Sequence, residues 1–143
     1  MNLLLKSATI IDKSSPFHFQ KKDILIESGV ITKIANSIKN ETSIKEVKLD
    51  NLHISQGWFD TSVCFGEPGF EERETIENGL KTAGKSGFTA VAVNPNTHPV
   101  ADNKSAIEFI KNKANGFATS LYPIGNLTKG SESKDIAELY DMQ

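Results

Sequence analysis

The stretch Gly57–Phe70, GWFDTSVCFGEPGF, marks the point where the pattern of the chain changes. Its apolar run Trp58–Val63 has the length of a buried strand, and the glycines and proline of Gly66–Gly69 then favour a turn. The next segment, Glu71–Gly87, is charged and carries apolar residues at helical spacing before a terminal glycine. A strand followed by a helix is the repeating unit of a parallel α/β sheet.

The same alternation continues towards the end of the chain. Phe88–Pro95, FTAVAVNP, is a second strand of the buried type, and Asp102–Gly116 follows as a helix with its first residue as the N-cap. Phe117–Leu127 contains the third strand, and Ser131–Met142 is expected to start a third helix. The apolar faces of the first two helices are expected at Ile76, Leu80, Ala83 and Gly84, and at Ile107, Ile110 and Ala114.

Strands that alternate with helices pair side by side through right-handed crossovers. We therefore expect Trp58–Val63, Thr89–Asn94 and Thr119–Ile124 to be adjacent parallel strands. Three βα units do not complete a closed barrel, which needs roughly 250 residues, so we expect an amino-terminal piece of a longer protein. An open three-stranded α/β sheet is the structural alternative. Either form has a free strand edge, through which the chain is expected to self-associate as a homo-oligomer.

Before Gly57 the chain is typical of short strands. The segments Leu3–Asp12, Asp23–Ile34 and Ile44–Asp50 are rich in β-branched and alternating apolar residues. Ser28–Gly29 lies between two β-branched runs and predicts a tight hairpin, because glycine tolerates the positive φ of such turns. We expect a small antiparallel layer.

Composition excludes several classes of function. The 143 residues are 38% hydrophobic and 24% charged, and the net charge of -2 comes from interspersed lysines and acids. Such a surface attracts neither nucleic acid nor an anionic membrane. The single cysteine forms no internal disulfide, and the amino terminus is apolar for only three residues before Lys6. We expect a cytoplasmic protein.

Gly79–Ser86, GLKTAGKS, matches the phosphate-loop pattern of nucleotide-binding proteins. That pattern works only in a turn that follows a strand and precedes a helix, where free backbone N–H groups point at the phosphates. Here the helical segment comes first and the strand follows. Phosphate-loop nucleotide binding is therefore the third and weakest of the functional hypotheses.

Two segments, which follow each other in the same order as in the family, resemble the dihydroorotase branch of the amidohydrolase superfamily. The first strand of that family reads Asp-x-His-x-His-x-Arg-Glu-Pro-Gly, and the second leads into a Pro-Asn-Thr-x-Pro turn. Here the corresponding segments are Asp60–Gly69, DTSVCFGEPG, and Pro95–Pro99, PNTHP. The matching residues are Gly57, Asp60, Glu67, Pro68, Gly69, Gly87, Phe88, Thr89, Pro95, Asn96, Thr97 and Pro99.

The resemblance extends over essentially the whole chain. Leu3–Asp12 and Asp23–Ala35 look like the family's amino-terminal β layer, and Tyr122–Gly130 looks like its third strand and turn. It implies an α/β fold in which residues 57–143 are the first three βα units of a TIM-type (β/α)8 barrel. Residues 1–56 are then the N-terminal part of the composite β domain.

The chain departs from the family where the chemistry lies. Ser62 and Cys64 stand at the positions of two zinc-binding histidines, and Gly66 stands where an arginine clamps the substrate carboxylate. Serine is a poor zinc ligand because its hydroxyl is neutral, and a lone cysteine in an apolar strand is more often a small buried residue. Although zinc is expected in active members, we expect no metal ligand and no catalytic residue here. The family's remaining ligands and catalytic aspartate come from later strands, outside this sequence.

Asn96 matches the asparagine that helps to hold the substrate carboxylate in the family, so the resemblance implies a substrate-binding role. The alternative is local, because Asn94–Pro99 is rich in turn formers and Asn96 then bonds only the nearby backbone. Asp60 is expected to hydrogen-bond within the strand end, and His98 to be a solvated loop residue.

Active members hydrolyse the cyclic amide of dihydroorotate reversibly to carbamoyl aspartate in pyrimidine synthesis. Without the ion neither water nor the amide carbonyl is activated, so we expect this chain to be inactive. Some dihydroorotase-like chains are structural partners of aspartate transcarbamoylase, and the resemblance implies that role here. The alternative is an active amidohydrolase whose rearranged metal site uses Cys64 and residues beyond this chain.

Overall fold

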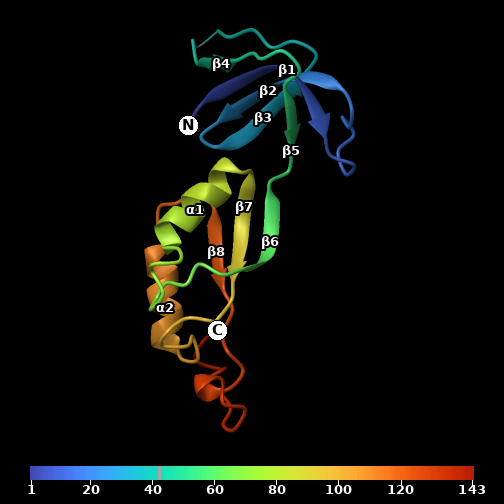
Figure 1. Ribbon diagram of the computed structural model, residues 1–143. Helices are drawn as coiled ribbons and strands as arrows, with labels where there is room; N and C mark the ends of the chain where they lie inside the picture. The colour runs from blue at the N-terminus through green and yellow to red at the C-terminus, as the bar shows by residue number, and fades with distance from the viewer. Residues whose placement is uncertain (42) are drawn as a thin grey trace. The chain divides into compact units, whose positions relative to one another are not determined.

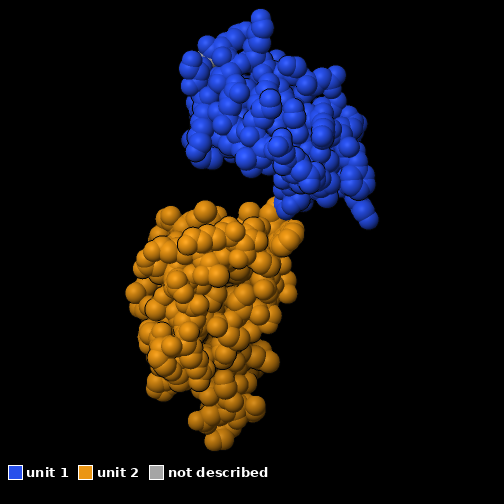
Figure 2. Space-filling model, turned by 45° about the horizontal axis from the view of Figure 1, so that its top comes forward, with its two compact units in different colours: residues 1–56 blue, residues 57–143 orange. Residues whose placement is uncertain are grey.

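The computed structural model describes residues 1–41 and 43–143 of the chain. They divide into two compact units, Met1–Gln56 (the N-terminal unit) and Gly57–Gln143 (the C-terminal unit), coloured separately in Figure 2. Strands make up the regular structure of the N-terminal unit, whereas strands and helices alternate in the C-terminal unit (Figure 1). The fold is mixed α/β, as the sequence predicts.

The N-terminal unit is one sheet with β1 at its centre. Its strands are β1 (Leu3–Ile11), β2 (Lys21–Glu27), β3 (Val30–Ala35), β4 (Lys45–Val47) and β5 (His53–Ser55). The order is β3-β2-β1-β4, and β5 also pairs with β1. The first three strands are antiparallel, but β4 and β5 run parallel to β1, so the prediction of a purely antiparallel layer is wrong for these two. Neither follows β1 through a tight turn, and only a tight turn requires antiparallel pairing.

The hairpin predicted at Ser28–Gly29 is confirmed. The two residues have φ values of 51° and 82°, and they join β2 to β3 so that Glu27 pairs with Val30. Two positive φ values in a two-residue loop match the right-handed twist of the flanking strands. The local sequence therefore determines this turn and the register beside it.

The buried carboxylate of Asp23 binds the backbone where the pairing of β1 is irregular. The pairing of β1 with β2 shifts around Ser7, whose φ is 54°. Asp23 accepts hydrogen bonds from the N–H groups of Ser7 and Ile38, both at 2.9 Å, and pairs with the Lys6 ammonium group. Burial disfavours the charged carboxylate, but these bonds outweigh burial and lower the pKa of Asp23.

The C-terminal unit contains three parallel strands in the order β6-β7-β8. Its elements are β6 (Trp58–Val63), α1 (Ile76–Lys85), β7 (Phe88–Val93), α2 (Lys104–Lys113), β8 (Ser120–Pro123) and the 3-10 turn η1 (Lys129–Ser131). Figure 1 shows both helices on one side of this sheet. The prediction of three adjacent parallel strands is confirmed.

The core of the C-terminal unit lies between the helices and the sheet. Ile76 and Leu80 of α1 and Ile110 of α2 are buried against Val91 and Val93 of β7. The apolar spacing of the two helices thus predicted the buried residues Ile76, Leu80, Ile107 and Ile110, whereas Gly84, expected on the same face of the first helix, is exposed. Within the described residues no helix is long and apolar enough to cross a membrane.

Helix α2 begins one residue later than the sequence predicts. Asn103 is its N-cap instead of Asp102, and its Oδ1 atom accepts the N–H of Ala106 at 3.1 Å. The Asp102 carboxylate accepts the N–H of Gly130 at 2.8 Å, and this bond is the main cause of its lowered pKa. A contact with a distant loop therefore decides between two adjacent capping residues.

The third helix predicted over Ser131–Met142 is wrong. The chain forms the short turn η1 and then further turns, and Ser133 has a φ of 59°, which interrupts a right-handed helix. Ile136 is 69% exposed and Tyr140 is 88% exposed. The apolar residues of this segment therefore have no surface against which a helix could bury them. Short helices depend on such packing for their stability.

Candidate functional site

The carboxyl ends of β6 and β7 lie side by side at one edge of the C-terminal sheet. The N–H of Asn94, directly after β7, donates to the carbonyl of Val63, the last residue of β6, at 2.9 Å. Binding sites in parallel α/β sheets lie at this edge, because the loops after neighbouring strands converge there. The segments that resemble the dihydroorotase motifs, Asp60–Gly69 and Pro95–Pro99, continue from these strand ends into the loops beyond them.

Ser62 and Cys64 both contact the side chain of Asn94. The Nδ2 atom of Asn94 lies 3.1 Å from Oγ of Ser62 and 3.3 Å from Sγ of Cys64. Cys64 is a free and exposed thiol. The prediction of a small buried cysteine is wrong, because β6 ends at Val63 and Cys64 stands on the loop beyond it.

Sequence reasoning missed Asn94 as a site residue. The signal was present, since Asn94 is the first polar residue after the apolar run of β7. Parallel pairing brings the end of that run beside the end of β6, where Ser62 and Cys64 lie. Asp60 behaves as predicted, because its Oδ1 atom accepts the N–H of Ser62 at 3.0 Å.

Gly66, at the position of the family's arginine, has a backbone that disfavours any side chain. Its φ is 93°, and a Cβ atom added there would lie 2.7 Å from the carbonyl oxygen of Phe70. The N–H of Phe70 donates to the Gly66 carbonyl at 3.0 Å and holds this tight turn. The turn has no room for a carboxylate anchor at this position in its present conformation.

Glu67, the acidic residue of the Glu-Pro-Gly motif, is buried and has a structural role. Its Oε2 atom accepts the N–H of Ile76, the first residue of α1, at 2.8 Å. Its Oε1 atom lies 3.1 Å from Nζ of Lys113 at the end of α2. One carboxylate thus connects the loop after β6 to both helices and complements the positive end of α1.

The loops after β6 and β7 pack closely against each other. The N–H of His98 donates to the carbonyl of Pro68 at 2.8 Å. A Cβ atom added to Gly69 would lie 2.1 Å from the carbonyl oxygen of His98, so only glycine permits this approach. The contact holds the Pro95–Pro99 turn beside the Glu-Pro-Gly turn.

Asn96 and His98 are exposed on this turn, whereas Thr97 between them is buried and donates from Oγ1 to the Pro99 carbonyl at 2.8 Å. Among the described residues the Asn96 side chain forms no hydrogen bond. The alternative prediction, that Asn96 bonds the nearby backbone, is therefore wrong, because Thr97 makes the bond that holds this turn. A substrate-binding role of Asn96 stays a prediction.

The donor set at this edge does not fit a zinc ion. Ser62 offers a neutral hydroxyl and Cys64 a single thiol, and both already accept from the Asn94 amide. His18 and His53 belong to the N-terminal unit, where each contacts nearby backbone. His98 lies on the Pro95–Pro99 turn, where its ring centroid is 6.4 Å from that of Phe70. In residues 1–41 and 43–143, no group of three or more His, Cys, Asp or Glu side chains is arranged to hold a metal.

The phosphate-loop pattern Gly79–Ser86 lies inside α1 and at its C-cap. The N–H of Gly79 donates to Thr75 at 2.9 Å, and the N–H of Ser86 donates to Thr82 at 3.0 Å. These groups are not free to bind phosphates, so the nucleotide hypothesis lacks its structural context. Gly79 serves packing, since an added Cβ atom would lie 2.4 Å from the ring of Phe65.

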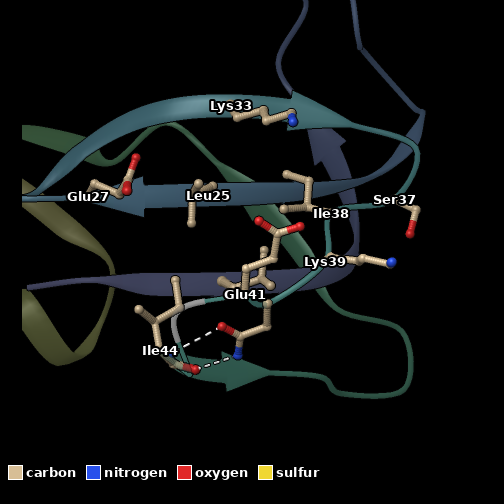
Figure 3. Close-up of a pocket in the computed structure, with 10 residues that line it drawn as sticks. Leu25, Glu27, Lys33, Ser37, Ile38, Lys39, Glu41 and Ile44 are labelled. Atoms are coloured by element: carbon tan, nitrogen blue, oxygen red, sulfur yellow. Dashed lines mark hydrogen bonds between the residues drawn. The ribbon is translucent and has the colours of Figure 1, made fainter.

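A separate hollow of about 380 Å³ lies in the N-terminal unit. Leu25 and Ile38 contribute apolar walls, and Asn40 joins the Ile44 backbone through two hydrogen bonds, dashed in Figure 3. Its charged lining includes lysines and glutamates, among them Lys33 and Glu41. These mixed charges select neither an anion nor a cation, so the hollow is a weaker candidate than the strand ends.

The order of the motifs agrees with a comparison to known families. The sequence model of the family described as Dihydro-orotase-like matches residues 52–142. The chain belongs to this family. It is 39% identical over 143 residues to the dihydroorotase of Pelotomaculum thermopropionicum, and 34% identical over 145 residues to that of Geobacter metallireducens.

Both alignments cover 100% of this chain but only 33% and 34% of the two dihydroorotases. The chain thus spans about a third of the length of these curated relatives. Solved structures share its fold. The L-hydantoinase (dihydropyrimidinase) of Arthrobacter aurescens matches with a TM-score of 0.72 at 16% identity, over 89% of this chain and 28% of that chain. A dihydroorotase crystal structure matches with a TM-score of 0.63 at 15% identity, over 90% of this chain and 32% of that chain.

Proposed function

We propose that this dihydroorotase-like chain has lost hydrolytic activity and serves as a structural partner of aspartate transcarbamoylase. The observation that carries the proposal is the pair Ser62 and Cys64, whose side chains meet the Asn94 amide where the family has zinc-binding histidines. The proposed location is the cytoplasm, where pyrimidine synthesis supplies this partner.

The proposed inactivity follows from the chemistry of the donors. In active members zinc makes a hydroxide available at neutral pH and polarises the amide carbonyl. Ser62 does neither, and Cys64 alone is a weak ligand because zinc affinity needs several converging donors. The tight turn at Gly66 also leaves no carboxylate anchor, so Asn96 is the one substrate contact that the proposal retains.

We further propose that the C-terminal unit represents the first βα units of a TIM-type barrel. Val91, Val93 and Leu121 pack towards the helices, so their strand neighbours face the other side of the sheet. On that side Phe59 and Tyr122 are 55% and 56% exposed, and their ring centroids lie 5.9 Å apart. Exposed aromatic rings and a free β8 edge suit a sheet that further strands or a second copy would cover.

Two measurements test this role. The longest natural form that contains this sequence should not hydrolyse dihydroorotate, and it should co-elute with aspartate transcarbamoylase of the same organism at micromolar concentrations. Turnover of roughly 1 per second or more would contradict the inactive assignment. Separate elution of the two proteins across a hundredfold concentration range would contradict the partnership alone.

An active amidohydrolase with a rearranged metal site is the second candidate. The exposed thiol of Cys64 at the end of β6 favours it, because a solvent-accessible thiol at that edge is available to a metal. This alternative needs ligands from strands beyond the chain. Replacement of Cys64 by serine separates the two candidates, since it would abolish hydrolysis in the alternative and change nothing in the inactive assignment.

A further inference from the structure

We infer that the side-chain amide of Asn94 has taken the structural place of the metal ion at the carboxyl ends of β6 and β7, and that it keeps cations out. This inference rests on the proposed function, because it explains how the strand ends are held together without a metal. It makes Asn94 a positioning residue.

The Nδ2 atom of Asn94 contacts two side chains at once, as a small bound ligand would. Ser62 and Cys64 are two residues apart, and both side chains approach one atom, Nδ2 of Asn94, at 3.1 and 3.3 Å. Asn94 is itself anchored, because its N–H donates to the Val63 carbonyl at 2.9 Å. A donor from β7 thus bridges two acceptors that follow one another along β6 and its loop.

In the observed orientation, with Nδ2 towards Ser62 and Cys64, the Asn94 amide and a cation exclude each other at this position. An amide nitrogen presents N–H groups with positive partial charge and offers no lone pair to a metal. A zinc ion would need to lie about 2.0 to 2.3 Å from donors at positions 62 and 64, in the space that the Asn94 amide occupies. Histidines introduced at these positions would also accept hydrogen bonds from the amide, and those bonds would engage the lone pairs that a metal requires.

Metal titration of the 143-residue chain tests the inference. The variant Ser62→His/Cys64→His is compared with the same variant carrying Asn94→Ala, and with a control carrying Asn115→Ala, an exposed asparagine after α2. Cobalt(II) binding is followed by visible absorption, with circular dichroism as the check on folding. We expect the Asn94→Ala form to bind cobalt at least about tenfold more tightly than the other two, which should agree within about twofold. Equal affinity of all three would overturn the inference.

Thermal unfolding gives a second test that needs no introduced histidine. Asn94→Ala should lower the unfolding midpoint by about 2–4 °C, and adding Ser62→Ala should lower it no further, because both changes remove the same bond. An unchanged midpoint in Asn94→Ala would also overturn the inference. Zinc bound by the unaltered chain would contradict the proposed function, whereas equal cobalt affinities would contradict only the role of Asn94.

Discussion

The Oε2 atom of Glu67 lies 2.8 Å from the backbone nitrogen of Ile76, so a carboxylate from the loop after β6 binds the first residue of α1. The Glu-Pro-Gly motif thereby connects the loop after β6 to both helices of the C-terminal unit. A motif that the family shares therefore does not by itself indicate catalysis.

Glu67→Gln should destabilise the chain by about 1–3 kcal/mol. The side chain is buried, and the change removes the charge that meets both the α1 terminus and Lys113. Chemical denaturation of the purified chain measures the loss. Glu72→Gln, at an exposed position in the same loop, is the control and should change stability by less than about 0.5 kcal/mol. Similar losses in both variants would contradict the structural role of Glu67.

Asp23 should make the stability of the N-terminal unit depend on pH. Its folded-state pKa is lowered, so its ionised form stabilises the fold above the unfolded-state value of about 4, and this contribution disappears as pH falls through the lowered pKa. Unfolding free energies measured between about pH 6 and 2 should fall more steeply in the wild type than in Asp23→Asn. Asp50→Asn, at an exposed position, should retain the wild-type slope. Parallel curves for the wild type and Asp23→Asn would refute this assignment.

Gly79→Ala should cost about 1–3 kcal/mol of stability, because the added methyl group meets the ring of Phe65 at 2.4 Å in a packed core. Gly84→Ala in the same helix should cost less, since its nearest contact is Thr119 Oγ1 at 3.2 Å.

Calorimetric titration with ATP and magnesium should give no binding in any form. Nucleotide binding that Lys85→Ala abolishes would restore the phosphate-loop hypothesis.

The isolated chain should self-associate through the uncovered face of the C-terminal sheet. Sedimentation velocity should give oligomers at micromolar concentrations, and Phe59→Lys/Tyr122→Lys should shift them towards monomer, because two charges then oppose association. Tyr140→Lys changes a residue that is 88% exposed outside that sheet and should leave the distribution unchanged. A monodisperse wild-type monomer would contradict self-association through this face of the sheet.

The sequence predicted the parts of the fold that depend on local pattern. Each of these parts depends on only a few neighbouring residues. They are the apolar runs of β6 and β7, the helical face of Ile76 and Leu80, and the Ser28–Gly29 turn. The prediction of a third helix was wrong because its apolar residues have no surface against which to pack. The parallel pairing of β4 and β5 depends on long connections, whose course no local pattern determines.

At the candidate site the sequence identified Ser62, Cys64 and Gly66 but not the partner that joins the first two. Asn94 becomes relevant only when β6 and β7 are placed side by side, which is a long-range event. The strand β6 ends at Val63, as the apolar run predicts, but the exposure of Cys64 on the loop beyond it was not predicted. The exposure of a loop residue depends on tertiary contacts, which a local pattern does not contain.

The metal content of the longest natural form that contains this sequence decides whether Ser62 and Cys64 leave the end of β6 without zinc. The protein is purified without chelator, incubated with a slight excess of zinc, desalted and measured by elemental analysis, beside a Cys64→Ser variant. We expect much less than one zinc per chain in both forms, because Ser62 and Cys64 supply one thiol and no imidazole, and the Asn94 amide already lies between them. One zinc per chain in the wild type, lost in Cys64→Ser, would contradict this expectation.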